Sequence, residues 1–395
     1  MSRNTRPFIP FARPSIGPEE MAAAQRVLES GWLTTAKEAA ALEEEFAVAV
    51  KATETPRCLA VNSATAGLHL AAEAAGIGPD QKVLMSPYTF TSTGEVVRYL
   101  GAHPVFVDIE DGSLTMDEEK ALAMIDRDPE IVAVMPVHLA GLRTTSESFL
   151  RELRSRGIQV IEDAAHLCPS LGLPEARALG DFVVYSFYAT KPITTGEGGI
   201  VVTYDTPGAE RIGVMRLHGI DRPVWDRQKG RAKAWEYDVV APGYKYNLPD
   251  LSAALGRVQL RRSPELRRRR QEIARHYLSA LGDRDYLKLP EDREDHSWHL
   301  FIVSLKGDRL SVTRDELAEE LAARGVGTSV HYKPLHLLSY YRESYGFEPD
   351  DFPVSLERFM TSLSLPIYPD LSEDDVEYIA RSVVAICEPQ RKVRG

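Results

Sequence analysis

The chain has 395 residues, of which 44% are hydrophobic and 27% charged, a composition typical of soluble globular proteins. It carries 47 basic and 58 acidic residues, a net charge of −11, which argues against nucleic-acid or anionic-membrane binding. Three scattered cysteines without metal-ligand spacing predict neither a disulfide framework nor a metal site. No apolar run has membrane-spanning length and no signal-peptide pattern is visible, so we expect a cytoplasmic protein.

Two helices are predicted first, near residues 17–30 and 37–49, after an irregular, proline-punctuated start. From there, short apolar runs alternate with amphipathic helical segments. The seven runs cover residues 58–61, 82–85, 104–107, 131–137, 158–161, 182–186 and 199–203. Apolar runs without strict alternation, separated by helices, predict an α/β fold with a mainly parallel sheet covered by helices on both faces.

The last third of the chain has a different pattern. A charge-rich helix is predicted over about residues 251–280, with a possible break at Ser263-Pro264. Strands near 297–305 and 327–332 and helices near 313–324 and 372–384 follow. We therefore predict a large α/β domain over residues 1–255, whose segment 1–36 borders the functional site, and a small α+β domain over residues 256–395.

Ligands of such sheets bind beyond the carboxyl ends of the strands, so the residues after each run are candidates. The first run leads into Asn62-Ser-Ala-Thr-Ala-Gly67, a hydroxyl-bearing helix start suited to a phosphate. The run 82–85 leads into Ser86-Pro-Tyr-Thr-Phe90, and the run 158–161 into Glu162-Asp-Ala-Ala-His166. The run 182–186 leads into a polar turn with one lysine, Lys191, before the glycine-rich Gly196-Glu-Gly-Gly199.

Each candidate has an ordinary structural explanation by itself. Lys191 fits a surface loop, Asp163 a helix cap, His166 a capping or core histidine and Phe90 the core. Together, one amine, one strand-end carboxylate, an aromatic ring and a phosphate-binding helix start are the parts needed to hold pyridoxal phosphate (PLP).

The parts would have different roles in a PLP site. Lys191 would form a Schiff base with the cofactor and then shuttle protons. Ionised Asp163 would keep the pyridine nitrogen protonated, and His166 would contact the phenolic oxygen. The ring-stacking and phosphate contacts would come from Phe90, Ala64, Thr65 and Ser186.

Eight segments carry a resemblance to a known family: 30–35, 62–68, 89–90, 161–166, 186–191, 196–199, 243–250 and 331–336. On these segments the chain resembles the sugar aminotransferases of the DegT/DnrJ/StrS type, over roughly residues 10–385. The resemblance implies the aspartate-aminotransferase fold (PLP fold type I), the roles given above, and a homodimer with shared active sites. Asn247 would reach the phosphate from the neighbouring subunit.

Within the family, the chain looks most similar to the UDP-4-amino-4-deoxy-L-arabinose aminotransferase group. This similarity implies a ping-pong transfer of an amino group, with glutamate as donor, to the 4-keto group of a nucleotide-diphosphate sugar. Where the family commonly has Thr-Thr-Gly-Pro, this chain has Thr34-Thr35-Ala36-Lys37, and the alanine removes freedom to adopt a positive φ in a loop that borders the sugar site. The loop 219–242 is expected to close over the site. The residues expected to contact substrate are Thr35, Tyr88, Arg231, His331, Lys333 and His336.

Three alternatives stand beside this hypothesis. The same scaffold serves transfer to carbon 3 of the sugar. A non-catalytic regulatory protein would keep the fold and the cofactor pocket without turnover. A nucleotide-binding α/β protein without PLP would need a glycine-rich dinucleotide turn after the first strand, and Asn62-Ser-Ala-Thr is not one.

Overall fold

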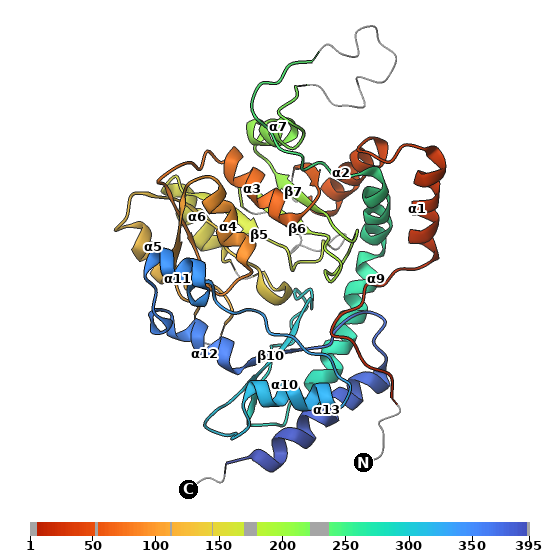
Figure 1. The fold of residues 1–395 in the computed structure, drawn as a ribbon, viewed down its shortest axis with the longest axis vertical. Coiled ribbons are helices and arrows are strands. Elements are labelled where there is room, and N and C mark those ends of the chain that lie inside the picture. The colour runs from red at the N-terminus through yellow and green to blue at the C-terminus, as the bar shows by residue number, and fades with distance from the viewer. Residues whose placement is uncertain are drawn as a thin grey trace.

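The computed structural model describes residues 6–51, 54–110, 113–143, 145–169, 180–221 and 237–392. Figure 1 shows a large α/β part in its upper region and a smaller part below, where both chain ends lie. In the described ranges, no helix combines the length and apolar character needed to cross a membrane. The same ranges contain no group of three or more His, Cys, Asp or Glu side chains placed to hold a metal ion.

The large part is built on a seven-stranded sheet with the order β1-β7-β6-β5-β4-β2-β3. Its strands are β1 (Arg57–Val61), β2 (Lys82–Met85), β3 (His103–Phe106), β4 (Ile131–Val134), β5 (Gln159–Asp163), β6 (Phe182–Ser186) and β7 (Gly199–Thr203). All neighbouring pairs from β3 to β6 are parallel, whereas β7 is antiparallel to both β6 and β1. The predicted α/β fold with a mainly parallel sheet is confirmed.

Helices cover both faces of this sheet. They are α2 (Lys37–Ala49), α3 (Ala64–Ala74), α4 (Thr91–Tyr99), α5 (Glu118–Ile125), α6 (Glu147–Ser155) and α7 (Thr206–Met215). The first helix, α1 (Pro18–Ser30), packs instead against the later helix Asp250–Leu281. Successive β6 residues point to opposite faces. Val184 packs in the cluster that contains Leu68 of α3, whereas Val183 and Tyr185 pack with Phe46 of α2. The sheet is therefore buried on both sides, and its strand ends are the places open to a ligand.

One long helix, α9 (Asp250–Leu281), extends from the large part to the small part (Figure 1). It packs against α1 and α2 at one end and against α13 (Glu373–Cys387) at the other. The break expected at Ser263-Pro264 is absent, because packing on both halves holds the helix through Pro264. The domain boundary after residue 255 stays a prediction, and it would fall inside α9.

The small part contains an antiparallel sheet of β8 (Leu287–Lys288), β9 (Phe301–Leu305) and β10 (Ser362–Leu365). The strand expected from residue 297 begins only at Phe301, because the chain turns at Trp298, where φ is +50°. Residues 327–332 form an isolated bridge at Ser329 and no strand. Among the described residues, the remaining helices are α10 (Arg314–Ala323), α11 (Ser339–Tyr345), α12 (Pro353–Thr361) and four 3-10 turns at Leu139–Gly141, Leu335–Leu337, Pro349–Asp351 and Glu388–Gln390.

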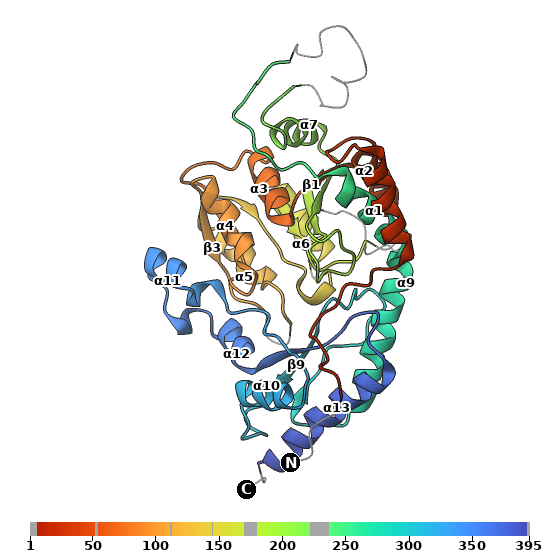
Figure 2. The ribbon, with the colours of Figure 1, turned by 45° about the vertical axis from the view of Figure 1, so that its right-hand side comes forward.

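The segment before α1 runs across the junction of the two parts (Figure 2). Ile9 bridges to Val326 of the small part, and Arg6 forms an ion pair with Asp375 at the start of α13. Phe11 and Ala12 then reach the cavity described below. The N-terminal segment thus contributes one wall of that cavity.

Candidate active site

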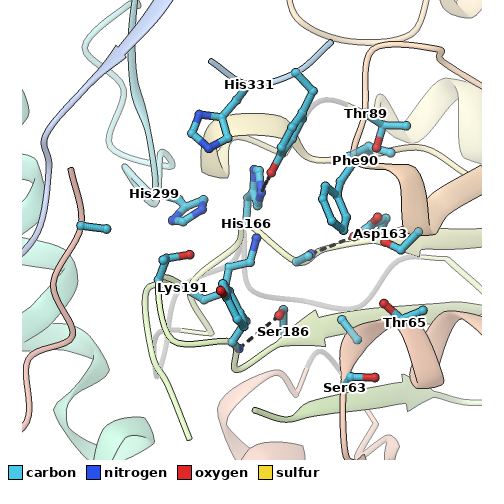
Figure 3. Close-up of a pocket in the computed structure, with 18 of the residues that line it drawn as sticks. Ser63, Thr65, Thr89, Phe90, Asp163, His166, Ser186, Lys191, His299 and His331 are labelled. Carbon is cyan, nitrogen blue, oxygen red and sulfur yellow. Dashed lines mark hydrogen bonds between the residues drawn. The ribbon is translucent and has the colours of Figure 1, made fainter. Parts of the chain in front are cut away.

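A cavity of about 560 Å³ lies beyond the carboxyl ends of β4, β5 and β6, with residues of the small part on its opposite side. Its size is that of a cofactor or small-ligand site. The structure brings eight of the predicted residues to its lining: Ala64, Thr65, Phe90, Asp163, His166, Ser186, Lys191 and His331. Figure 3 shows their arrangement.

Lys191 projects into this cavity from the turn that follows β6, with its amine directed toward His166 (Figure 3). The turn is fixed by the Lys191 amide, which donates to the Tyr188 carbonyl at 2.9 Å. Burial lowers the pKa of the Lys191 amine to about 8, although the Asp163 carboxylate acts in the opposite direction. At neutral pH an appreciable fraction of the amine is therefore unprotonated and nucleophilic.

Asp163 is the last residue of β5 and is held by backbone and side-chain hydrogen bonds. Its amide donates to the Pro136 carbonyl at 2.9 Å, and its carbonyl accepts from His138 at 3.0 Å. Oδ1 accepts from the Ala165 amide at 3.1 Å, and Oδ2 accepts from Thr93 Oγ1 at 2.9 Å. Burial raises the pKa of Asp163, and these donors and the Lys191 amine oppose that rise.

Glu162, one residue earlier, points to the other side of β5 and anchors a cluster in which the Glu162 and His138 side chains are fully buried. Oε2 lies 2.5 Å from both Arg143 Nη1 and His138 Nε2, and Oε1 accepts from the Gly180 amide. Burial alone would raise the pKa of Glu162, but Arg143 and His138 lower it to about 2. The cluster fixes the strand end that presents Asp163 to the cavity.

His166 is held in one tautomer. Its Nδ1 accepts from the Ala140 amide at 3.1 Å, so the proton lies on Nε2, which is 3.0 Å from the Tyr332 hydroxyl. Burial, and then the nearby Lys191 amine, lower the pKa of His166 well below its ordinary value. A neutral His166 presents an N–H donor to the cavity, as the expected contact to a phenolic oxygen requires.

Sequence reasoning did not find His299 and Tyr332, which also line the cavity. The His299 ring lies 4.3 Å from the His166 ring, centroid to centroid, and its Nδ1 has no hydrogen-bond partner among the described residues. His299 follows the positive-φ residue Trp298, and Tyr332 lies next to His331, so neither occupies a strand end of the large sheet. No signal in the sequence marked His299, whereas Tyr332 lies within segment 331–336, which carries the family resemblance.

The start of α3 forms the wall of the cavity that lies across from the residues of the small part (Figure 3). Ser63 caps the helix, because its Oγ accepts from the Ala66 amide at 3.1 Å. Ala64 and Thr65 occupy the first turn, where amides have no acceptor within the helix. Gly199 allows this close approach, since a Cβ at that position would lie 2.8 Å from the Ala64 nitrogen. The wall is suited to an anion such as a phosphate.

Four of the residues expected to contact substrate, Thr35, Tyr88, Lys333 and His336, do not line this cavity. Tyr88 is 1% exposed and packs with Ile109 and Leu139, and His336 is buried, with Nε2 3.2 Å from the Pro349 carbonyl. Lys333 is exposed outside the cavity lining. Arg231 and most of the 219–242 loop lie outside the described residues.

Thr35 and Asn247 lie together at a second cavity of about 1010 Å³ between α2 and α7. Asn247 Nδ2 donates to Thr35 Oγ1 at 2.6 Å, and Lys245 Nζ donates to Asn247 Oδ1 at 2.5 Å. Neither residue lines the Lys191 cavity of the same chain. This position is compatible with the expectation that Asn247 serves a neighbouring subunit.

The donor set of the Lys191 cavity fits PLP. It combines an amine of lowered pKa, a buried carboxylate, a neutral histidine, the ring of Phe90 and the first turn of a helix. These groups match an aldehyde, a pyridine nitrogen, a phenolic oxygen, an aromatic face and a phosphate, in that order.

Comparisons with known proteins agree with this fit. The profile of the DegT/DnrJ/EryC1/StrS aminotransferase family matches residues 14–384. The spore coat polysaccharide biosynthesis protein SpsC of Bacillus subtilis (strain 168) is 39% identical over 380 residues, 95% of this chain and 96% of that protein. A PLP form of Spr1654 from Streptococcus pneumoniae, assigned as a sugar aminotransferase, superposes with a TM-score of 0.86 at 29% identity, covering 97% of this chain and 99% of that one.

A third similar structure is DesI, solved in the presence of its TDP-sugar product. Its TM-score is 0.81 at 28% identity, and the match covers 95% of this chain and 92% of that one. The fold and the cavity thus define a PLP-dependent enzyme of fold type I. The chain belongs to the DegT/DnrJ/EryC1/StrS aminotransferase family.

Replacing Gly199 with alanine is expected to weaken PLP binding about tenfold and to destabilise the protein by roughly 1–3 kcal/mol. The new methyl group would meet the Ala64 nitrogen, the Ser63 carbonyl carbon and the Tyr185 oxygen at 2.8–2.9 Å, so the start of α3 must move. Equilibrium dialysis of PLP against the apoprotein measures the affinity. Gly78→Ala is the matched control, because a Cβ there would meet no atom within 4 Å; equal losses in both variants would contradict this reading of the α3 wall.

Proposed function

We propose that this enzyme transfers an amino group from glutamate to the 4-keto group of a nucleotide-diphosphate sugar, by a ping-pong reaction. The observation that carries the proposal is the Lys191 amine, placed in one cavity with Asp163 and the start of α3. The relation to SpsC and DesI, whose names refer to polysaccharide biosynthesis and a TDP-sugar product, supports a sugar nucleotide as acceptor.

Bound PLP supplies an electron sink for the negative charge that develops on a substrate carbon. In the proposal, Lys191 is the residue that attaches the cofactor and afterwards moves a proton to and from that carbon. Its pKa of about 8 suits both tasks at neutral pH, since neither protonation state is strongly disfavoured.

The other residues of the cavity would hold the cofactor and orient it. Asp163 would provide a negative charge for the ring nitrogen, and the Nε2–H of His166 would be the donor for the phenolic oxygen. Phe90 offers an aromatic face, while Ala64, Thr65 and Ser186 offer amides and hydroxyls to the phosphate. His331 and His299, whose Nδ1 has no hydrogen-bond partner among the described residues, lie on the side of the cavity contributed by the small part, where a substrate would enter.

A homodimer is part of the proposal. Asn247 lies with Thr35 at the α2–α7 cavity, away from Lys191 of its own chain. In a dimer joined over this cavity, Asn247 would reach the phosphate of the neighbouring site. Thr35, one of the residues expected to contact substrate, lies at the same cavity. The nucleotide sugar would therefore also reach the edge of the dimer interface.

The direct test uses purified enzyme loaded with PLP. Incubation with glutamate should release 2-oxoglutarate and convert the bound cofactor to its amine form, and a 4-keto nucleotide sugar should then regenerate PLP. NMR of the product should place the new amine at carbon 4. An amine at carbon 3 would support the first alternative, and an enzyme that binds PLP but accepts no amino donor would support the regulatory alternative.

A further inference from the structure

Two threonine hydroxyls form a chain behind Asp163. Thr93, fully buried in the first turn of α4, has Oγ1 2.9 Å from Asp163 Oδ2, and Thr89 Oγ1 lies 2.9 Å from Thr93 Oγ1. A hydroxyl has one hydrogen, and an ionised carboxylate only accepts hydrogen bonds. Thr93 must therefore donate to Asp163, and Thr89 must donate to Thr93. The chain has one direction, and it ends on the carboxylate.

Asp163 depends on few donors. Among the described residues, its side chain accepts from the Ala165 amide on Oδ1 and from Thr93 on Oδ2. The other charged or titratable groups near it are Lys191, across the cavity, and His138 and Tyr332. Asp163 also lines the cavity, so its remaining lone pairs are available to a ligand.

The position of α4 reinforces the effect of these hydroxyls. Thr93 lies in the first turn of a helix that begins at Thr91, so the Asp163 carboxylate that it contacts lies near the positive end of the helix dipole. Thr89 is 1% exposed and precedes the helix, at the same edge of the cavity as Phe90 (Figure 3). Water therefore has little access to replace either hydroxyl.

We infer that Thr93 is a positioning residue for the proposed reaction and that Thr89 orients it, because together they keep Asp163 ionised and fix the rotation of its carboxylate. The inference rests on the proposed role of Asp163 opposite the ring nitrogen of PLP. Neither threonine needs to touch the substrate. A charge that is held in place before the ligand binds costs little reorganisation during the reaction.

Thr93→Val tests the inference, because valine has the shape of threonine without the hydroxyl. With one donor fewer, the pKa of Asp163 rises, so its carboxylate is neutralised at a higher pH and PLP leaves earlier in an acid titration. We expect the acid midpoint of PLP release to move up by about 1–2 pH units. We also expect kcat to fall about 10- to 100-fold with little change in KM for the amino donor. Thr93→Ser, which keeps the hydroxyl, should restore both.

Two further variants sharpen the test. Thr89→Val should move the midpoint in the same direction by less, and adding it to Thr93→Val should cause no further shift, since Thr89 acts through Thr93. Thr89→Val also leaves the hydrogen bond from Thr93 to Asp163 in place, so this variant still tests the inference if Thr93→Val does not fold. Thr91→Val is the control, because the Thr91 hydroxyl donates to Glu95 at 2.8 Å on the same helix and should leave the midpoint unchanged.

The outcomes separate this inference from the proposed function. An enzyme that binds PLP and transfers amino groups, but whose Thr93→Val variant releases PLP at the wild-type midpoint, would overturn the inference alone. Equal effects of Thr93→Val and Thr91→Val would do the same. A protein that binds no PLP would instead overturn the proposed function.

Discussion

Lys191→Ala is expected to lower the rate of amino transfer by at least about 10³-fold, because no other amine in the described cavity can attach the cofactor and move the proton. The variant should also lose the visible absorbance band of the bound cofactor, while its circular dichroism stays that of the wild type. Borohydride treatment followed by peptide mass spectrometry should find the cofactor mass on the Lys191 peptide of the wild type.

The control variants distinguish the chemical role of the Lys191 amine from the effect of its positive charge. Lys191→Arg keeps a positive charge without a titratable amine and should be as inactive as Lys191→Ala. Lys306→Ala removes an exposed lysine and should change neither rate nor absorbance. Addition of methylamine should partly restore proton transfer in Lys191→Ala. Normal turnover in Lys191→Ala would rule out the role that we propose for this residue.

Glu162→Ala is expected to lower the free energy of unfolding by about 3–5 kcal/mol, because it leaves the Arg143 guanidinium buried without its carboxylate. His138 and the Gly180 amide lose an acceptor at the same time. Urea denaturation of the apoproteins measures the loss. Glu152→Ala breaks an exposed pair with Arg156 and should cost about 0.5 kcal/mol or less; a similar small loss for Glu162→Ala would contradict the importance of the buried cluster.

The same cluster predicts a pH dependence. The pKa of Glu162 is about 2 in the folded protein, against an ordinary value of 4.5. A folded-state pKa below the unfolded one stabilises the protein above the unfolded pKa, and this stabilisation is lost as the pH falls. The difference between wild type and Glu162→Ala should therefore be constant above about pH 5 and shrink between pH 4.5 and 2. Denaturation midpoints measured across that range give the comparison.

The sheet and the cofactor side of the cavity were predictable from sequence because they follow from local pattern. Buried parallel strands read as apolar runs, and their carboxyl ends meet at one edge, so Asp163, Ser186 and Lys191 are brought together by topology. The phosphate-binding start of α3 was predictable for the same reason, because a strand end followed by small and hydroxyl-bearing residues and then a helix is a local sequence pattern.

The substrate side was not predictable, because it depends on side-chain direction within irregular chain. In segment 331–336, His331 faces the cavity, Lys333 faces away from it, and His336 is buried beneath the surface. Sequence spacing cannot separate these three directions when no regular element sets the period. His299 and Thr93 were missed for a related reason, since their roles arise from contacts 133 and 70 residues away in the chain, to His166 and Asp163.

The continuous helix α9 has a mechanical consequence for this cavity. With 32 residues, it is a rod of roughly 48 Å, and 17 of those residues follow Pro264 toward the small sheet. A tilt of only about 5° at Pro264 would displace the far end, at Leu281, by about 2 Å. The residues of α9 before Pro264 pack against α1 and α2, and those after it pack against α13 of the small part. A tilt of this size would therefore move the wall that carries His299 and His331, relative to Lys191, by an amount comparable to a hydrogen-bond length.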